Sequence, residues 1–184
     1  IIVNSYKKSF FTKSKNIVNT VRSGNIIGGG DFSKNRIIPD IIRSIMNKNN
    51  LVIRNKEHTR PWLFILDTLT GYLKLAEHSF VNNKISGAWN FAPKKSYSVN
   101  QIIQYCLKEK IINNFKENQL CKDKETRNLM LDSSKSRDKI KWSPKLNFSK
   151  SLYYTFEWYK SYILNKDMKI FTSQQIQKYL KNDL

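Results

Sequence analysis

Acidic residues are scarce in this chain: 14 Asp and Glu face 33 Lys and Arg, which gives a formal net charge of +19 over 184 residues. Such an excess invites a nucleic-acid interpretation, because basic side chains neutralise phosphates. The lysines, however, are scattered through nearly every segment, and no signature of an RNA- or DNA-binding module is present. We therefore predict no nucleic-acid partner. A non-catalytic basic module that binds nucleic acid or a nucleotide is kept as the alternative from another functional class.

Cysteine, histidine and long apolar runs are also scarce. Cys106 and Cys121 form no CxxC pair and have no histidine at metal-ligand spacing, so the sequence predicts neither a metal site nor a disulfide framework. No apolar run approaches the roughly 18 residues of a membrane-spanning helix. These absences predict a cytoplasmic protein without a membrane partner.

The strongest local pattern is the glycine-rich stretch Arg22-Ser-Gly-Asn-Ile-Ile-Gly-Gly-Gly-Asp31. Alternating apolar residues predict a strand that runs into this stretch, and its glycines let the backbone approach a ligand closely. Further along, Arg60 precedes a proline and a tryptophan, and its planar guanidinium suits a diphosphate. Together the two segments predict half of a binding site for a sugar joined to a diphosphate.

The apolar spacing predicts an α/β chain. Asp67 is expected to be the N-cap of a helix that buries Leu69, Tyr72, Leu73 and Ala76. Helices are predicted over 1–11, 36–47, 68–80, 99–110 and 149–164, with a short one starting at 132–135. Strands are predicted over 16–27, 51–53, 62–66, 87–93 and 129–131.

Several motifs follow one another in a recognisable order: the glycine-rich stretch, Arg36-Ile-Ile-Pro-Asp-Ile-Ile-Arg43, Arg60-Pro-Trp62 with Asp67, Gly87-Ala-Trp-Asn-Phe91, Leu131-Asp-Ser-Ser-Lys135 and Trp142-Ser-Pro-Lys145. This order resembles the C-terminal half of the extended short-chain dehydrogenase/reductases, in the NAD-dependent epimerase/dehydratase family. Within that family the chain looks most like the CDP-glucose 4,6-dehydratases. The UDP-sugar epimerases and dTDP-glucose dehydratases usually carry Asn-x-Tyr-Gly-Pro and Arg-Asp-Trp or Arg-Asp-Tyr at the corresponding positions.

The resemblance implies an α/β fold, namely the C-terminal part of a Rossmann-type enzyme with its smaller substrate-binding lobe, the N-terminal dinucleotide-binding portion being missing. Residues 1–30 would be a remnant of the Rossmann domain, 31–165 mainly the substrate-binding lobe with crossover segments, and 166–184 a polar C-terminal tail. The resemblance places the family's catalytic Tyr-x-x-x-Lys pair in the missing N-terminal portion, so we expect no catalytic residue in this chain and no turnover by it alone.

The resemblance also implies an activity for the intact protein. It would use NAD to convert CDP-glucose to CDP-4-dehydro-6-deoxy-glucose and water, in deoxysugar and surface polysaccharide biosynthesis, and it would form a homodimer. An NAD-dependent dehydratase or epimerase acting on a dTDP- or UDP-sugar is the nearest alternative.

Position within the resemblance assigns candidate site residues. The residues expected to bind the nucleotide-sugar are Asn25, Arg36, Ile37, Ile53, Arg54, Arg60 and Asn90. Gly24 and Asn25 are also expected near the cofactor. A purely structural role remains the alternative for each, such as an amide that stabilises the turn or an apolar side chain that packs in the core. No metal is expected.

Overall fold

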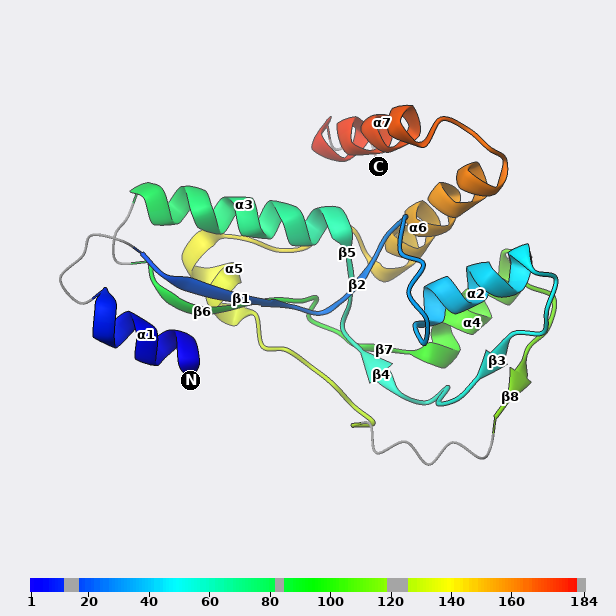
Figure 1. The fold of residues 1–184 in the computed structure, drawn as a ribbon, viewed down its shortest axis with the longest axis horizontal. Coiled ribbons are helices and arrows are strands. Elements are labelled where there is room, and N and C mark those ends of the chain that lie inside the picture. The colour runs from blue at the N-terminus through cyan, green and yellow to red at the C-terminus, as the bar shows by residue number, and fades with distance from the viewer. Residues whose placement is uncertain (12–16, 82–84, 119–125, 182–184) are drawn as a thin grey trace.

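A computed structural model describes residues 1–11, 17–81, 85–118 and 126–181 (Figure 1). Its helices are α1 (Ile2–Phe10), α2 (Ile37–Met46), α3 (Ile65–Val81), α4 (Val99–Lys108), α5 (Ser134–Ile140), α6 (Phe148–Ile163) and α7 (Met168–Lys181). Its strands are β1 (Asn19–Ser23), β2 (Asn25–Ile27), β3 (Val52–Ile53), β4 (Thr59–Arg60), β5 (Trp62–Phe64), β6 (Gly87–Phe91), β7 (Tyr97–Ser98) and β8 (Lys116–Glu117). The α/β class predicted from the sequence is confirmed.

The elements form two groups joined by short strands. In Figure 1, β1 and β6 lie with α3 and α5 at one end, whereas α2 and α4 lie with β3 and β8 at the other. Strands β2 and β5 run between the two groups, and α6 and α7 lie beside them. The segment between the groups is therefore where residues from both can meet.

The strand predicted over 16–27 is divided at Gly24. Its first part, β1, pairs in parallel with β6, and its second part, β2, pairs in parallel with β5 so that Asn25 lies opposite Trp62. The Gly24 N–H donates to the Phe91 carbonyl, and a Cβ at Gly24 would collide with the Pro61 carbonyl. Only glycine fits there. The chain passes at this position from its pairing with β6 to its pairing with β5.

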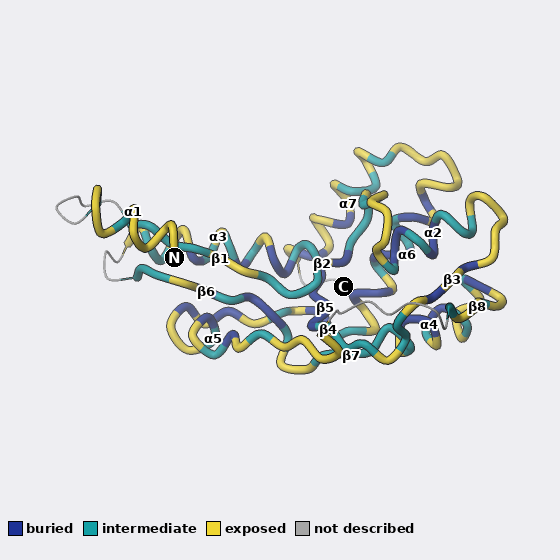
Figure 2. The backbone as a smooth tube through the Cα atoms, turned by 60° about the horizontal axis from the view of Figure 1, so that its bottom comes forward, coloured by how far each residue is buried: buried dark blue, intermediate teal, exposed yellow. Residues whose placement is uncertain are grey.

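Each group has its own apolar core. One cluster joins α2, α4 and α6 through fully buried side chains such as Ile41, Ile102 and Leu152. A second cluster, under α3, is built from Trp89, Phe91 and other buried residues. Figure 2 shows buried backbone running along the inner side of both groups. The α2 helix forms because its isoleucines recur at helical spacing, and Pro39 sits in its first turn, where a missing N–H costs nothing.

Several predicted elements are confirmed. The structure shows α1, α2, α4 and α6 close to their expected bounds, and Ser98 caps α4 in a capping box with Gln101. The strand predicted over 129–131 is wrong, because these residues form no strand, and the pairing beside them is a single bridge from Asn128 to Thr59. The two-residue strands β4, β7 and β8 were not predicted, since so short a segment carries no periodic signal.

The prediction for Asp67 is wrong. Helix α3 begins at Ile65, so Asp67 lies inside its first turn and is fully buried. The predicted buried face is confirmed only at Tyr72, which packs against the core, whereas Leu69 and Leu73 are 45% and 70% exposed and Ala76 is exposed as well. Gly71 and Leu75 face the core instead, and a Cβ at Gly71 would collide with the Phe91 ring.

The buried Asp67 carboxylate fastens the C-terminal helix to the rest of the fold. It accepts hydrogen bonds from the Lys145 N–H at 2.7 Å and from the Tyr179 hydroxyl at 2.7 Å. Burial raises the pKa of this carboxyl, although the bonds from Tyr179 and Lys145 oppose that effect. Helix α7 is thus anchored at its end, more firmly than its polar sequence suggests.

Neither a membrane span nor a metal cluster is found in the part of the chain that the structure describes. No helix within it is long and apolar enough to cross a bilayer. No group of three or more metal-ligating side chains occurs within it either. Cys106 is fully buried in the core, and burial raises the pKa of its thiol to about 12, whereas Cys121 lies outside the described residues.

Replacing Tyr179 with Phe tests the anchor. The variant keeps the ring but leaves the buried Asp67 carboxylate short of one donor, so we expect the free energy of unfolding to fall by about 1 to 3 kcal/mol. Urea denaturation of the intact protein measures this change. Replacing the exposed Tyr153 with Phe is the matched control and should change the unfolding free energy by less than about 0.5 kcal/mol. Equal stability of the Tyr179 variant and the parent would contradict the anchor.

Candidate functional site

A cavity of about 520 Å³ lies between the connecting strand β2 and the group that contains α2 and β3. Its wall is formed by β2, the start of α2, the end of β3 and the segment from Asn55 to Trp62. A volume of this size falls within the roughly 300 to 1,000 Å³ of small-molecule sites. Its position, at the end of the parallel strand β2, is also where open α/β sheets bind their ligands.

The structure brings six of the seven predicted substrate-binding residues to this cavity. They come from four segments that are distant in sequence, namely β2, the start of α2, β3 and β4. Those lining the wall are Asn25, Arg36, Ile37, Ile53, Arg54 and Arg60. Asn25 reaches the wall because β2 pairs with β5, and Arg60 lies two residues before the Trp62 that faces Asn25. Within the described part of the chain, the Asn25 amide makes no side-chain hydrogen bond.

Asn90 does not line the cavity. Its amide group donates to the Asp132 carbonyl at 2.9 Å, and its Oδ1 atom is buried without a partner among the described residues. The register of β6 explains this position, because Asn90 pairs with Arg22 on β1 rather than with a residue of β2. The structure thus gives Asn90 the structural role that the sequence left as the alternative, which is to tie β6 to the segment before α5.

Arg60 is held in place by backbone carbonyls. Its Nη1 atom donates to the carbonyls of Thr59, Thr126 and Arg127 at 2.9, 3.0 and 3.2 Å. The flanking strand β4 pairs with β7, which fixes the backbone of Arg60 opposite Tyr97. A guanidinium oriented in this way loses less conformational freedom when it binds an anion.

The glycine-rich turn packs closely against protein at three of its four glycines. A Cβ at Gly29 would fall inside the indole of Trp158, one at Gly28 would collide with Ile65, and one at Gly24 would collide with Pro61. Gly30 is the member that needs glycine for its backbone conformation, with φ of +85°. Gly24 and Gly28 also line the cavity, and the expectation that the backbone there approaches a ligand stays a prediction.

The sequence analysis gave no role to several polar residues of the cavity wall, namely Asp31, Asn35, Asp40, Asn55, His58 and Tyr159. His58 lies two residues before Arg60 in the segment that enters β4. Its closeness to the Arg60-Pro-Trp62 motif was the signal in the sequence that could have identified it. Tyr159 comes from α6, and nothing in the sequence links that helix to the glycine turn.

The cavity is polar and carries more positive than negative side chains. Arg36, Arg54 and Arg60 line its wall together with Asp31 and Asp40. Both carboxylates are already engaged, because Asp31 pairs with Arg36 and Asp40 pairs with Arg43. The excess of guanidinium groups favours an anionic ligand, and guanidinium forks match the oxygens of phosphates.

Replacing Gly29 with Ala tests the packing of the turn. The added methyl group meets Trp158, so we expect the free energy of unfolding to fall by about 1 to 3 kcal/mol. In a Trp158→Ala background the same change should cost much less, because the indole is gone. Gly30→Ala is the control: its cost of roughly 1 kcal/mol comes from the positive φ and should be the same in both backgrounds.

A double-mutant cycle by denaturant unfolding measures the coupling between the two positions. Additive effects of Gly29→Ala and Trp158→Ala would show that the two residues do not touch.

The chain is similar in sequence to one well-characterised type of enzyme. It is 29% identical over 191 residues to the CDP-glucose 4,6-dehydratase of Salmonella typhimurium, an alignment that covers 98% of this chain and 53% of that protein. No family model matches the chain. The chain spans about half the length of the curated relative it matches.

Solved structures share the fold. The UDP-glucuronic acid 4-epimerase from Bacillus cereus, in complex with UDP-glucuronic acid and NAD, superposes with a TM-score of 0.73 at 20% identity, over 87% of this chain and 49% of that one. The dTDP-glucose 4,6-dehydratase from Bacillus anthracis, in complex with NAD, gives a TM-score of 0.67 at 17% identity, over 87% and 49%. The chain therefore has the fold of about half of such an enzyme, and the resemblance predicted from its motifs is confirmed.

Proposed function

We propose that this chain is the nucleotide-sugar-binding half of an NAD-dependent nucleotide-sugar 4,6-dehydratase, a lyase. The observation that carries the proposal is the meeting of Asn25, Arg36 and Arg60 in one cavity, although the three come from separate segments of the chain. The CDP-glucose 4,6-dehydratase of Salmonella typhimurium aligns with nearly the whole chain, which favours CDP-glucose as the substrate. The product would be CDP-4-dehydro-6-deoxy-glucose, a precursor for deoxysugars of surface polysaccharides.

The residues of this chain would hold the substrate by its charged centre. Arg60, steadied by three carbonyls, would donate to the diphosphate from β4, and Arg36 would approach it from the start of α2. Asn25 would add an amide donor from the end of β2. Ile37 and Ile53 offer apolar surface on the same wall, which suits a nucleoside beside the diphosphate, with Arg54 next to it.

NAD would supply the hydride acceptor in the intact enzyme. Gly24 and Asn25, which both line the cavity, are the residues of this chain that would lie near that cofactor. The role of this chain in the reaction is therefore to bind and orient the nucleotide-sugar. Homodimer formation and a cytoplasmic location belong to the same proposal for the intact protein.

A dTDP- or UDP-sugar dehydratase or epimerase is the second candidate function. It is favoured by the fold, which this chain shares with a UDP-glucuronic acid 4-epimerase and a dTDP-glucose 4,6-dehydratase. Incubation of the intact enzyme with CDP-, UDP- and dTDP-glucose separates the candidates. A 4-keto-6-deoxy product from CDP-glucose alone supports the first, whereas a 4-epimer or turnover of another nucleotide-sugar supports the second.

Replacing Arg60 with Ala in the intact enzyme tests the proposal. A hydrogen bond between charged groups contributes about 1.5 to 3 kcal/mol, so we expect the dissociation constant for CDP-glucose to rise about 10- to 150-fold. NAD affinity should not change. Arg60→Lys should restore only part of the affinity, because an ammonium group cannot donate as a planar fork.

Isothermal titration calorimetry with each ligand measures these constants. Arg137→Ala is the matched control, since Arg137 also bonds to its own segment but does not line the cavity. Equal CDP-glucose affinity in the Arg60→Ala variant and the parent would remove Arg60 from the site. Binding to DNA with a steep salt dependence, and none to nucleotide-sugars, would instead support the basic-module alternative.

A further inference from the structure

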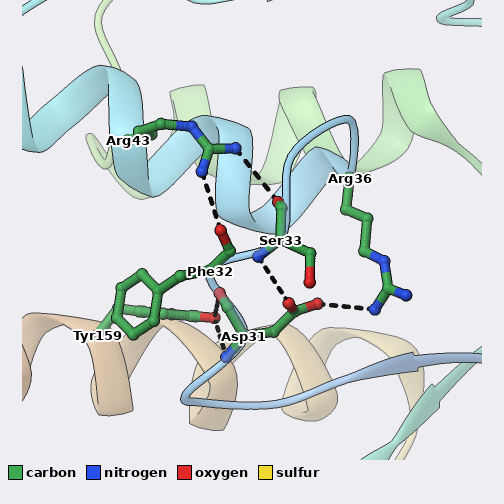
Figure 3. Close-up of polar contacts among 6 residues, drawn as sticks. All are labelled: Asp31, Phe32, Ser33, Arg36, Arg43 and Tyr159. Carbon is green, nitrogen blue, oxygen red and sulfur yellow. Dashed lines mark hydrogen bonds and ion pairs between the residues drawn. The ribbon is translucent and has the colours of Figure 1, made fainter.

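The loop between β2 and α2, residues 28–36, forms one rim of the cavity and is fixed by side chains from two helices. The Tyr159 hydroxyl of α6 donates to the Asp31 carbonyl at 2.6 Å and accepts from the Asp31 N–H at 3.0 Å. Arg43 of α2 donates to the carbonyls of Phe32 and Ser33 at 3.0 and 3.2 Å (Figure 3). The backbone on both sides of the Asp31 side chain is therefore immobilised.

Packing and protonation support the same arrangement. The Phe32 ring meets Tyr159 edge-on, with ring centroids 5.7 Å apart. Burial raises the pKa of Tyr159 to about 12, so its hydroxyl stays protonated and keeps its bond to the Asp31 carbonyl at neutral pH. The loop thus has a single well-supported conformation despite its three consecutive glycines.

The fixed loop directs the Asp31 carboxylate at Arg36. One carboxylate oxygen accepts from the Ser33 N–H at 2.9 Å, and the other accepts from Arg36 Nη1 at 3.0 Å. Partial burial opposes ionisation of Asp31, but the bonds from Ser33 and Arg36 outweigh it and lower the pKa of the carboxyl. Figure 3 shows the two side chains pointing toward each other at the start of α2.

Arg36 keeps most of its donors for a ligand. Its side chain is 66% exposed, it lines the cavity, and within the described part of the chain only Nη1 is bonded. An arginine this exposed would otherwise sample many rotamers, and ordering it on binding would cost free energy. Asp31 supplies the restraint in advance, since one end of the guanidinium is held while Nε and Nη2 remain available.

We propose that Asp31 is a positioning residue for the nucleotide-sugar site: it holds Arg36 in the orientation that receives the diphosphate. The proposal rests on the proposed function and extends it to a residue that acts through Arg36. A carboxylate beside an anion site ordinarily weakens anion binding by repulsion, whereas the proposal requires that Asp31 strengthens it. The sign of the effect of removing the charge therefore separates positioning from simple electrostatics.

Asp31→Asn in the intact enzyme is the test, with the steady-state kinetics of CDP-glucose turnover as the readout. Positioning predicts that KM rises about two- to fivefold while kcat is unchanged, because the lost pair is exposed and Arg36 contacts only the diphosphate. Asp31→Glu keeps the carboxylate and should recover part of the affinity. In an Arg36→Ala background, Asp31→Asn should have no further effect on KM.

Asp132→Asn is a matched control from the same chain. Asp132 also accepts from the N–H of the serine two residues later, at 2.8 Å, and pairs at 3.9 Å with the arginine five residues later, but it does not line the cavity. Its replacement should leave KM unchanged. Melting temperatures of all variants show whether a change in KM follows a change in stability.

An unchanged or lowered KM in Asp31→Asn would overturn the proposal, and so would a joint loss of stability and kcat, which would mark Asp31 as a structural residue only. If Arg36→Ala raises KM but Asp31→Asn does not, the inference alone fails and the site stands. If neither Arg36→Ala nor Arg60→Ala affects KM, the proposed function itself fails.

Discussion

The parallel pairing of β2 with β5 is the constraint on which the rest of the structure depends. It sets Asn25 against Trp62 and so brings the end of one strand beside the segment that carries His58 and Arg60. The pairing requires that the chain change partners at Gly24, where the Pro61 carbonyl leaves no room for a side chain. Gly24 and Pro61 therefore determine where the polar groups of the cavity lie.

A second layer of interactions makes the cavity wall rigid. Trp158 and Tyr159 of α6 hold the glycine turn, and Arg43 of α2 holds the residues that follow it. Helix α6 is in turn linked to α7 by the bond from Trp158 to Thr172, and α7 is anchored by Asp67. The rim of the cavity is thus supported from the C-terminal helices, and Tyr159 of α6 also forms part of its wall.

The sequence predicted the class of fold, and six of the seven residues that it assigned to the nucleotide-sugar site line one cavity. It failed where contacts are long-range. Helices such as α2 and α4 carry strong periodicity and a capping box, so they could be predicted locally. The buried position of Asp67 and the outward-facing Leu73 could not, because the choice of face on α3 depends on Phe91 and on α7. The motif order located Arg36 and Arg60 but not Tyr159, since the bonds from Tyr159 to Asp31 span 128 residues.

A crystal structure of the intact enzyme with CDP bound tests the central claim most directly. The account predicts that the diphosphate lies in the cavity between β2 and β4, with phosphate oxygens within about 3 Å of the Arg36 and Arg60 guanidinium groups. The Asp31 pair with Arg36 should be intact in that complex. A diphosphate bound elsewhere, with both guanidinium groups left facing solvent, would contradict the account.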